Sequence, residues 1–284
     1  MSRSVALVTD STSVDAELAS RLGAVVVPLQ VIIGAKAYDE GLDVTPDAVA
    51  VALKNRIPVS TSRPAPEVFL QVYGQAAERG MQAVVSVHLS SEVSGTFESA
   101  QLAARDAPIP VWTVDSRQLG MATGFAVQSA ASLLDAGAEA EEAAARAAAR
   151  AAATTALFYV DTMEYLRRGG RVGAAAALVG SALAVKPLLQ IENGRITPLE
   201  KVRTSAKAIT RLAELAVLAA DGRDVDVAVS HLAAPDRAQS LADRLGERIA
   251  TVNELVVTEV GAVIGAHVGP GMLAVVVSPQ DVGR

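Results

Sequence analysis

The chain has 284 residues, of which 51% are hydrophobic, and a formal net charge of −6. Its length predicts two domains or one large one. The absence of cysteine excludes disulfides, thiol catalysis and cysteine metal sites. The negative charge and the 3% aromatic content argue against nucleic-acid binding. No apolar run has the length of a membrane span, and no signal-peptide core precedes the first strand. We therefore expect a cytoplasmic protein with at most transient membrane contact.

The first half of the chain alternates apolar runs with amphipathic stretches. Residues 5–8 predict a strand, and the next helix should begin near Asp15 and end before Gly23. Residues 24–33 are again apolar, and Pro28 within them marks a strand edge or a bend.

Two further helices have recognisable starts. Thr45 followed by Pro46 is typical of an N-cap and first helical residue, and Pro66 opens a helix in the same way. Residues 82–87 and 111–114 predict strands. The Ala-, Glu- and Arg-rich residues 138–153 then predict a helix, which we interpret as solvent-facing.

The pattern changes after that helix. Residues 157–160 predict a strand, and Asp161 is a plausible cap for the helix that follows. The strand-like residues 188–191 and 195–199 flank Asn193-Gly194, the strongest short-range signal for a β-hairpin.

A parallel first half and a second half containing a hairpin predict two different α/β domains. We expect an N-terminal domain over residues 1–155, with a mostly parallel sheet and flanking helices. The C-terminal domain, residues 156–284, should contain a mixed sheet that includes the hairpin.

Two hydroxyl-rich segments could bind an anion. Thr61 and Ser62 precede the helix that opens at Pro66, where they could form either a local turn or a pair of donors. Ser94 and Gly95 follow a buried strand and open a helix. Backbone N–H groups at such a start attract anions, although a serine there could merely cap the helix.

Two other segments carry candidate residues. Arg171 follows a helix that ends in basic residues and two glycines, which by themselves could simply complement the helix dipole. His267 precedes a glycine- and proline-rich turn. A lone histidine is most often structural, but one that faces the hydroxyls could donate to a carboxylate.

No phosphate-binding loop and no dinucleotide-binding glycine motif occurs. The three histidines lack metal-ligand spacing, so we expect neither a metal nor a cofactor. Ser94 and His267 could be imagined as nucleophile and base of a stand-alone acyl hydrolase or transferase. Glu92, however, stands where a nucleophile elbow has its first glycine.

Eight segments, in this order along the chain, resemble those of the DegV family of bacterial fatty-acid-binding proteins. They are VTDST at 8–12, VPLQVIIGAKAYDEG at 27–41, TSRPAPEVF at 61–69, VHLSSEVSGTFESA at 87–100, VDSRQLGMATG at 114–124, FYVDTMEYLRRGGRV at 158–172, KPLLQIENGRITPLEKVRT at 186–204 and HVGPGML at 267–273.

The resemblance implies two α/β domains with a long-chain fatty acid, similar to palmitate or oleate, held between them as the ligand. It implies that the carboxylate meets five residues: Thr61, Ser62, Ser94, the N–H of Gly95 and His267. Arg171 and Arg203 lie in matching motifs, and the resemblance implies contact either with the ligand or with a partner protein.

Some members of the family serve as the acyl-carrying subunit of a fatty acid kinase, and the resemblance implies lipid transport or presentation of the acid to such an ATP-binding partner. A regulatory protein with a structural lipid is a further alternative. The chain departs from the family's usual T-S-Q-P-S at Arg63 and Ala65. Ala65 lacks a capping hydroxyl, and Arg63 could alter which acyl chains or partners are accepted.

Overall fold

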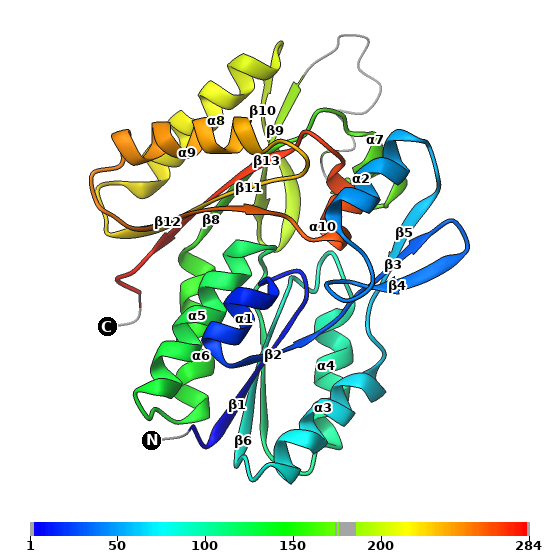
Figure 1. Ribbon diagram of the computed structural model, residues 1–284. Helices are drawn as coiled ribbons and strands as arrows, with labels where there is room; N and C mark the ends of the chain where they lie inside the picture. Colours follow the sequence, from blue (N-terminus) through cyan, green and yellow to red (C-terminus); the bar gives the residue numbers. More distant parts are fainter. Residues whose placement is uncertain (1–2, 174, 176–185, 283–284) are drawn as a thin grey trace.

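Three β-sheets and the helices between them make up the fold. The computed structural model describes residues 3–173, 175 and 186–282. Figure 1 shows a four-stranded sheet in the lower half of the molecule and a six-stranded sheet in the upper half. A small three-stranded sheet lies to one side of both, beside α10.

The four-stranded sheet is entirely parallel, as predicted for the first half of the chain, with the order β2-β1-β6-β7. Its strands are β1 (Val5–Asp10), β2 (Ala24–Val27), β6 (Ala83–His88) and β7 (Val111–Asp115). Every residue of β6 is buried, which is typical of a strand covered on both faces.

Helices cover both faces of this sheet. They are α1 (Ala16–Leu22), α3 (Pro66–Glu78), α4 (Thr96–Arg105), α5 (Met121–Asp135) and α6 (Ala140–Ala153). The pair α3 and α4 packs on one face, while α5 and α6 pack on the other and also contact the six-stranded sheet. The last two helices therefore form the layer between the two large sheets.

The six-stranded sheet is mixed, as predicted, with the order β10-β9-β8-β13-β11-β12. Its strands are β8 (Thr155–Tyr159), β9 (Lys186–Glu192), β10 (Arg195–Val202), β11 (Val225–His231), β12 (Val252–Glu259) and β13 (Leu273–Pro279). Asn193 and Gly194 join β9 to β10 with positive φ angles of 51° and 82°, which confirms the predicted hairpin.

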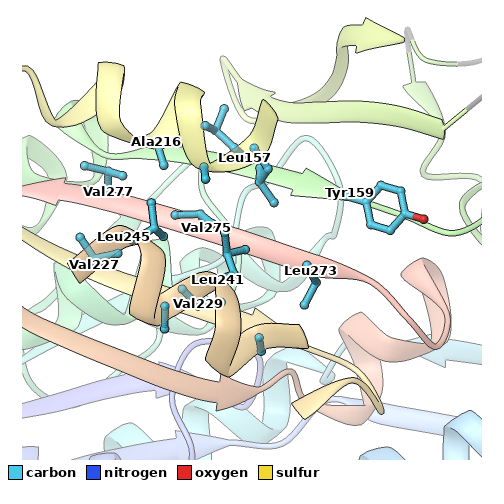
Figure 2. Close-up of a cluster of buried hydrophobic side chains, with 14 of the residues drawn as sticks. Leu157, Tyr159, Ala216, Val227, Val229, Leu241, Leu245, Leu273, Val275 and Val277 are labelled. Atoms are coloured by element: carbon cyan, nitrogen blue, oxygen red, sulfur yellow. The ribbon is translucent and has the colours of Figure 1, made fainter. Parts of the chain in front are cut away.

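A large apolar core fills the outer side of this sheet. Helices α8 (Ser205–Ala220) and α9 (Pro235–Arg248) cover the strands there. Figure 2 shows Leu241 and Leu245 of α9 directed at Val227, Val229 and the neighbouring strands. Full burial of one such leucine contributes about 1.5–3 kcal/mol.

The third sheet was not predicted. It consists of β3 (Gln30–Ile33), β4 (Lys36–Asp39) and β5 (Val59–Ser62), all antiparallel, in the order β4-β3-β5. The apolar run that begins at Ala24 divides at Pro28: β2 stays in the parallel sheet, and β3 joins this one. The predicted bend at Pro28 is therefore a change of sheet.

Residues from distant parts of the chain complete the small sheet's core. Helix α2 (Pro46–Lys54), capped by Thr45 as predicted, packs against α10 (Ala262–Val268). Helix α10 also contacts β3, β5 and α7 (Glu164–Arg168). Because α10 carries His267, this packing places the imidazole next to β5.

Two local predictions were wrong. One side of helix α6 is buried rather than solvated, because its alanines pack between the sheets, and Arg150 on the same helix bonds Asp226 of β11 at 2.6 Å. Asp161 does not cap α7, which begins after Met163 with no side-chain cap. Asp161 accepts instead from the hydroxyl of Tyr159.

Strand β8 begins at Thr155. We retain as a proposal the division into residues 1–155 and 156–284. Helix α10, from the second range, nevertheless packs on elements of the first.

Candidate functional site

Six of the seven residues predicted for the ligand site line one cavity of about 290 Å³. They come from the end of β5, the loop between β6 and α4, the segment after α7 and the last turn of α10. The six are Thr61, Ser62, Ser94, Gly95, Arg171 and His267. The seventh, Arg203, is exposed between β10 and α8 and does not line this cavity.

Thr61 and His267 are directly bonded although they stand 206 residues apart. The Thr61 Oγ1 and His267 Nε2 atoms are 2.8 Å apart. Burial, together with the positive charge of Arg171, lowers the pKa of His267 to about 4. The imidazole is therefore neutral near pH 7, with one nitrogen that donates and one that accepts.

The other imidazole nitrogen, Nδ1, is buried without a hydrogen-bond partner among the residues that the structure describes. It lies against Gly169, where a Cβ atom would overlap the ring. The glycine just after α7 thus gives the His267 ring the room to reach Thr61.

Thr61 and Ser62 lie on a strand and not on a turn, which corrects the expectation from the sequence. They are the last two residues of β5 and pair with β3, Thr61 opposite Val31 and Ser62 opposite Gln30. The chain reaches the start of α3 immediately afterwards. A strand end holds the Thr61 hydroxyl more rigidly than a loop would.

The Ser94-Gly95 segment opens α4, as predicted. Gly95 is the N-cap residue and no side chain caps this helix, so the alternative that a serine merely caps it is wrong. The Ser94 hydroxyl bonds the Thr96 hydroxyl at 2.9 Å. The first N–H groups of a helix lack intrahelical partners, and here they adjoin a cavity that four hydroxyl side chains line, those of Thr12, Thr61, Ser62 and Ser94.

Two guanidinium groups also line the cavity. Arg171 donates to the carbonyl oxygens of Val93 and Gly169, at 3.1 and 2.6 Å. Arg63 lies directly over Gly95, so closely that its side chain occupies the space of a Cβ atom there. From the sequence, Arg63 was expected only to alter which acyl chains or partners are accepted, because it departs from the family's motif.

A second cavity of about 480 Å³ adjoins the first, since Thr12 and Ile264 line both. Its lining is largely aliphatic and includes Ala19, Val26 and Met121, together with several hydroxyls. The combined volume of the two cavities lies within the range of about 300–1,000 Å³ that is usual for ligand pockets.

Glu40 is the buried carboxyl in the second cavity. It accepts from the Ser11 hydroxyl at 2.6 Å and from the Val263 N–H in the first turn of α10 at 2.7 Å. Burial raises the pKa of Glu40 despite these two bonds. Glu40 therefore fixes the start of the helix whose last turn carries His267.

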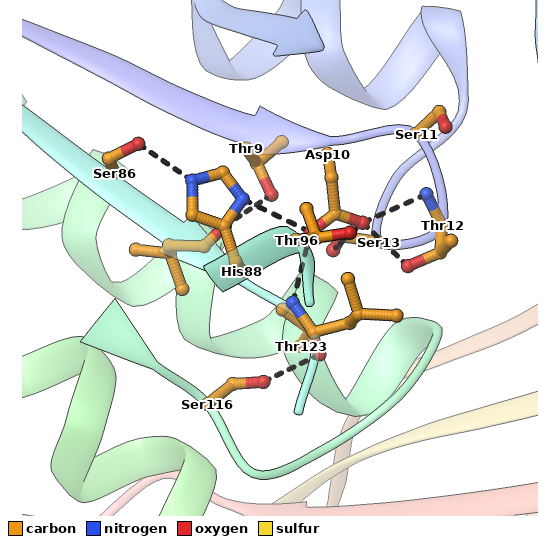
Figure 3. Close-up of polar contacts among 12 residues, drawn as sticks. Thr9, Asp10, Ser11, Thr12, Ser13, Ser86, His88, Thr96, Ser116 and Thr123 are labelled. Atoms are coloured by element: carbon orange, nitrogen blue, oxygen red, sulfur yellow. Dashed lines mark hydrogen bonds and ion pairs between the residues drawn. The ribbon is translucent and has the colours of Figure 1, made fainter. Parts of the chain in front are cut away.

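A buried polar cluster beneath the cavities was missed in the sequence (Figure 3). Asp10 accepts from the N–H groups of Thr12 and Leu89 and from His88 Nδ1 at 3.1 Å. Burial would raise the pKa of Asp10, but the bonds from His88, Thr12 and Leu89 together hold it below its usual value. Because Thr12 and Leu89 line the first cavity, this cluster shapes its floor.

The cluster continues from His88 Nε2 to the Ser86 hydroxyl, at 2.7 Å. A serine, a histidine and an aspartate in such a row are reminiscent of a hydrolase triad. All three side chains are fully buried, however, and the Ser86 hydroxyl is also bonded to Tyr73. The row is therefore closed to a substrate, and its order in space could not be inferred from the sequence.

The alternative pair, Ser94 and His267, lines one cavity without forming a nucleophile and base. Ser94 is bonded to Thr96, and His267 to Thr61. Within the described residues, no carboxylate orients the second nitrogen of His267. The hydrogen bond that a serine nucleophile requires is not made.

Among the described residues, no three His, Asp or Glu side chains lie together in a group that could hold a metal ion. No helix among them combines the length and apolar character needed to cross a membrane.

Comparison with known proteins identifies relatives over nearly the whole chain. The model of the DegV family, described as "Uncharacterised protein, DegV family", matches residues 4–280. A DegV domain-containing protein of Streptomyces coelicolor is 57% identical over 281 residues, covering 99% of this chain and 100% of the relative.

Solved structures match as well. A DegV family protein from Thermus thermophilus, described in terms of fatty acid binding, superposes with a TM-score of 0.92 at 32% identity. DegV of Bacillus subtilis, described as a fatty acid binding protein, gives 0.90 at 33% identity. Each comparison covers 98% of this chain and 100% of the other. The family model over residues 4–280 and the relative that is 57% identical over nearly the whole chain show that this chain belongs to the DegV family.

Proposed function

We propose that this chain binds a long-chain fatty acid, similar to palmitate or oleate, with its carboxylate in the first cavity and its acyl chain in the second. The observation that carries the proposal is the 2.8 Å bond between Thr61 and His267, made inside a cavity that Ser94 and Gly95 also line. The fatty-acid-binding descriptions of the Thermus and Bacillus relatives support it.

The headgroup is the demanding part of such a ligand. A carboxylate moved from water into a protein loses several kcal/mol of hydration unless donors replace the water. Thr61, Ser62 and Ser94 supply hydroxyl donors, and the start of α4 supplies N–H groups. If His267 Nε2 carries the proton and donates to Thr61, the Thr61 hydroxyl keeps its own hydrogen for the ligand.

The acyl chain provides most of the gross affinity. Each buried methylene contributes about 0.8 kcal/mol, so a 16-carbon tail gives about 10 kcal/mol before the cost of ordering it. Thr12 and Ile264 line both cavities, so we place beside them the passage of the acyl chain from the headgroup cavity into the larger aliphatic one. Flexible aliphatic and thioether side chains such as Met121 suit a flexible tail better than a flat ring.

The biological use that we propose is lipid transport or presentation of the bound acid to an ATP-binding fatty acid kinase subunit. The chain itself would then be the non-catalytic carrier. Arg203 is exposed and outside the headgroup cavity, so we assign it to a partner-facing surface. Arg171 lines the cavity and is assigned to the headgroup region.

Lipid analysis tests the proposal. The protein is purified from bacteria and denatured, and extracted lipids are measured by mass spectrometry against protein concentration. We expect close to one long-chain fatty acid per chain, and uptake of added palmitate or oleate after delipidation. Absence of both would refute the proposal.

The assigned headgroup residues are tested with the double substitution Thr61→Ala and Ser94→Ala. Loss of two hydrogen bonds to a charged group, at about 1.5–3 kcal/mol each, should weaken palmitate binding at least a hundredfold. The matched control is Thr210→Ala with Ser240→Ala, on α8 and α9, away from either cavity. Unchanged affinity in the first variant would place the carboxylate elsewhere.

A further inference from the structure

Unlike several other arginines of the chain, Arg63 has no carboxylate partner among the described residues. The guanidinium makes one hydrogen bond among the described residues, a long one of 3.4 Å from Nη1 to the Gly95 carbonyl oxygen. Arg150 and Arg211, by contrast, are paired with carboxylates at 2.6 and 2.8 Å. Arg63 is also exposed, so its guanidinium stands at the mouth of the headgroup cavity.

The charges around that cavity do not balance. Arg63 and Arg171 both line it, His267 is neutral, and no Asp or Glu occurs among its lining residues. Arg171 is held in place by two backbone carbonyls. Arg63 has only the one long bond, so most of its N–H donors remain for a ligand.

The position of Arg63 relative to the hydroxyls is also specific. It follows directly after Thr61 and Ser62 at the end of β5, and it covers the Cα atom of Gly95 beside Ser94. Any side chain larger than hydrogen at residue 95 would displace the guanidinium. The glycine therefore brings the arginine onto the loop that opens α4.

We propose that Arg63 is the ionic ligand of the bound headgroup, and that it makes this chain select an ionised acid over neutral lipids of the same chain length. This inference rests on the proposed function and deepens it. Hydroxyls alone can bind an alcohol or an ester nearly as well as an acid, since they both donate and accept. A guanidinium only donates and attracts a negative charge, so it discriminates between these headgroups.

The test compares two ligands that differ in the headgroup. Binding of tritiated palmitate and of tritiated 1-hexadecanol to delipidated protein is measured by equilibrium dialysis at pH 7.5. For Arg63→Gln we expect palmitate affinity to fall roughly five- to tenfold, the size of a partly exposed ionic contact, with hexadecanol affinity unchanged. Arg63→Lys, which keeps the charge, should retain most of the preference for palmitate.

The matched control is Arg79→Gln, which makes the same charge change at the far end of α3, about 20 Å along the helix from its start. It should leave both affinities unaltered. Equal loss of both ligands in Arg63→Gln, or no loss of either, would overturn the inference while leaving the proposed function intact. If the unmodified protein bound neither ligand, the proposed function would fail and this inference with it.

Discussion

Gly169→Ala tests whether the Thr61–His267 pair organises the headgroup cavity. Gly169 has φ −74°, a value open to alanine, so the substitution adds a methyl group without backbone strain. The added Cβ would come within 2.8 Å of His267 Cε1 and still closer to Nδ1. Keeping the imidazole ring in place against the new methyl group would cost about 1–3 kcal/mol of overpacking. We therefore expect the ring to move.

Movement of the ring breaks its bond to Thr61 and misaligns the hydroxyl that we assign to the ligand. A hydrogen bond to a charged group contributes about 1.5–3 kcal/mol, so palmitate affinity should fall at least tenfold. The freed imidazole should also titrate closer to its ordinary pKa of 6.5 than to about 4. NMR titration of the histidine ring protons measures that change directly.

The control adds the same methyl group in open space. Gly74 lies inside α3 with no atom near the position of a new Cβ, so Gly74→Ala should preserve binding and raise stability by up to about 1 kcal/mol. If Gly169→Ala bound palmitate as tightly as the unmodified protein and kept the low pKa of His267, the reasoning would be refuted.

Three further predictions concern the same cavities and their support. The pKa of His267 is about 4 in the folded protein against 6.5 in the unfolded chain, so the free energy of unfolding should decline by at most about 3 kcal/mol as the pH falls from 6.5 to 4. Urea denaturation should show a shallower decline with pH for His267→Gln. An equal decline in the two proteins would contradict the lowered pKa of His267. Ile264→Trp should obstruct the passage between the cavities, lowering palmitate affinity at least tenfold but sparing octanoate; parallel loss of both acids would place the tail elsewhere. Asp10→Ala should lower the free energy of unfolding by about 3 kcal/mol or more, because it leaves His88 and the Leu89 N–H buried without an acceptor. A loss below about 1 kcal/mol would contradict the role of Asp10 as their acceptor.

Much of the architecture could be predicted because local signals and long-range packing agree. The positive-φ residues Asn193 and Gly194 form the hairpin their sequence indicates, and the wholly buried β6 reads as an apolar run. The three-stranded sheet could not be predicted in this way. Its short strands are half exposed, and Pro28 separates two pairing partners that a continuous run of Val and Ile conceals.

The candidate site was predicted through its motifs and not through its geometry. Nothing local to Thr61 or His267 indicates that they meet, because their contact depends on α10 packing against β3 and β5. The role of Asp10 was hidden for the same reason, since its partner His88 lies 78 residues away. The burial of helix α6 was not predicted, because alanine is compatible both with a solvated helix and with close packing between two sheets.

The most direct measurement is a crystal structure of the delipidated protein soaked with 16-bromohexadecanoate, in which anomalous scattering locates the bromine. We predict the carboxylate within hydrogen-bonding distance of Thr61 Oγ1 and Ser94 Oγ, and the bromine among the aliphatic residues of the second cavity, near Ala19 and Val26. Bromine outside that cavity, or a carboxylate that touches neither hydroxyl, would contradict the account.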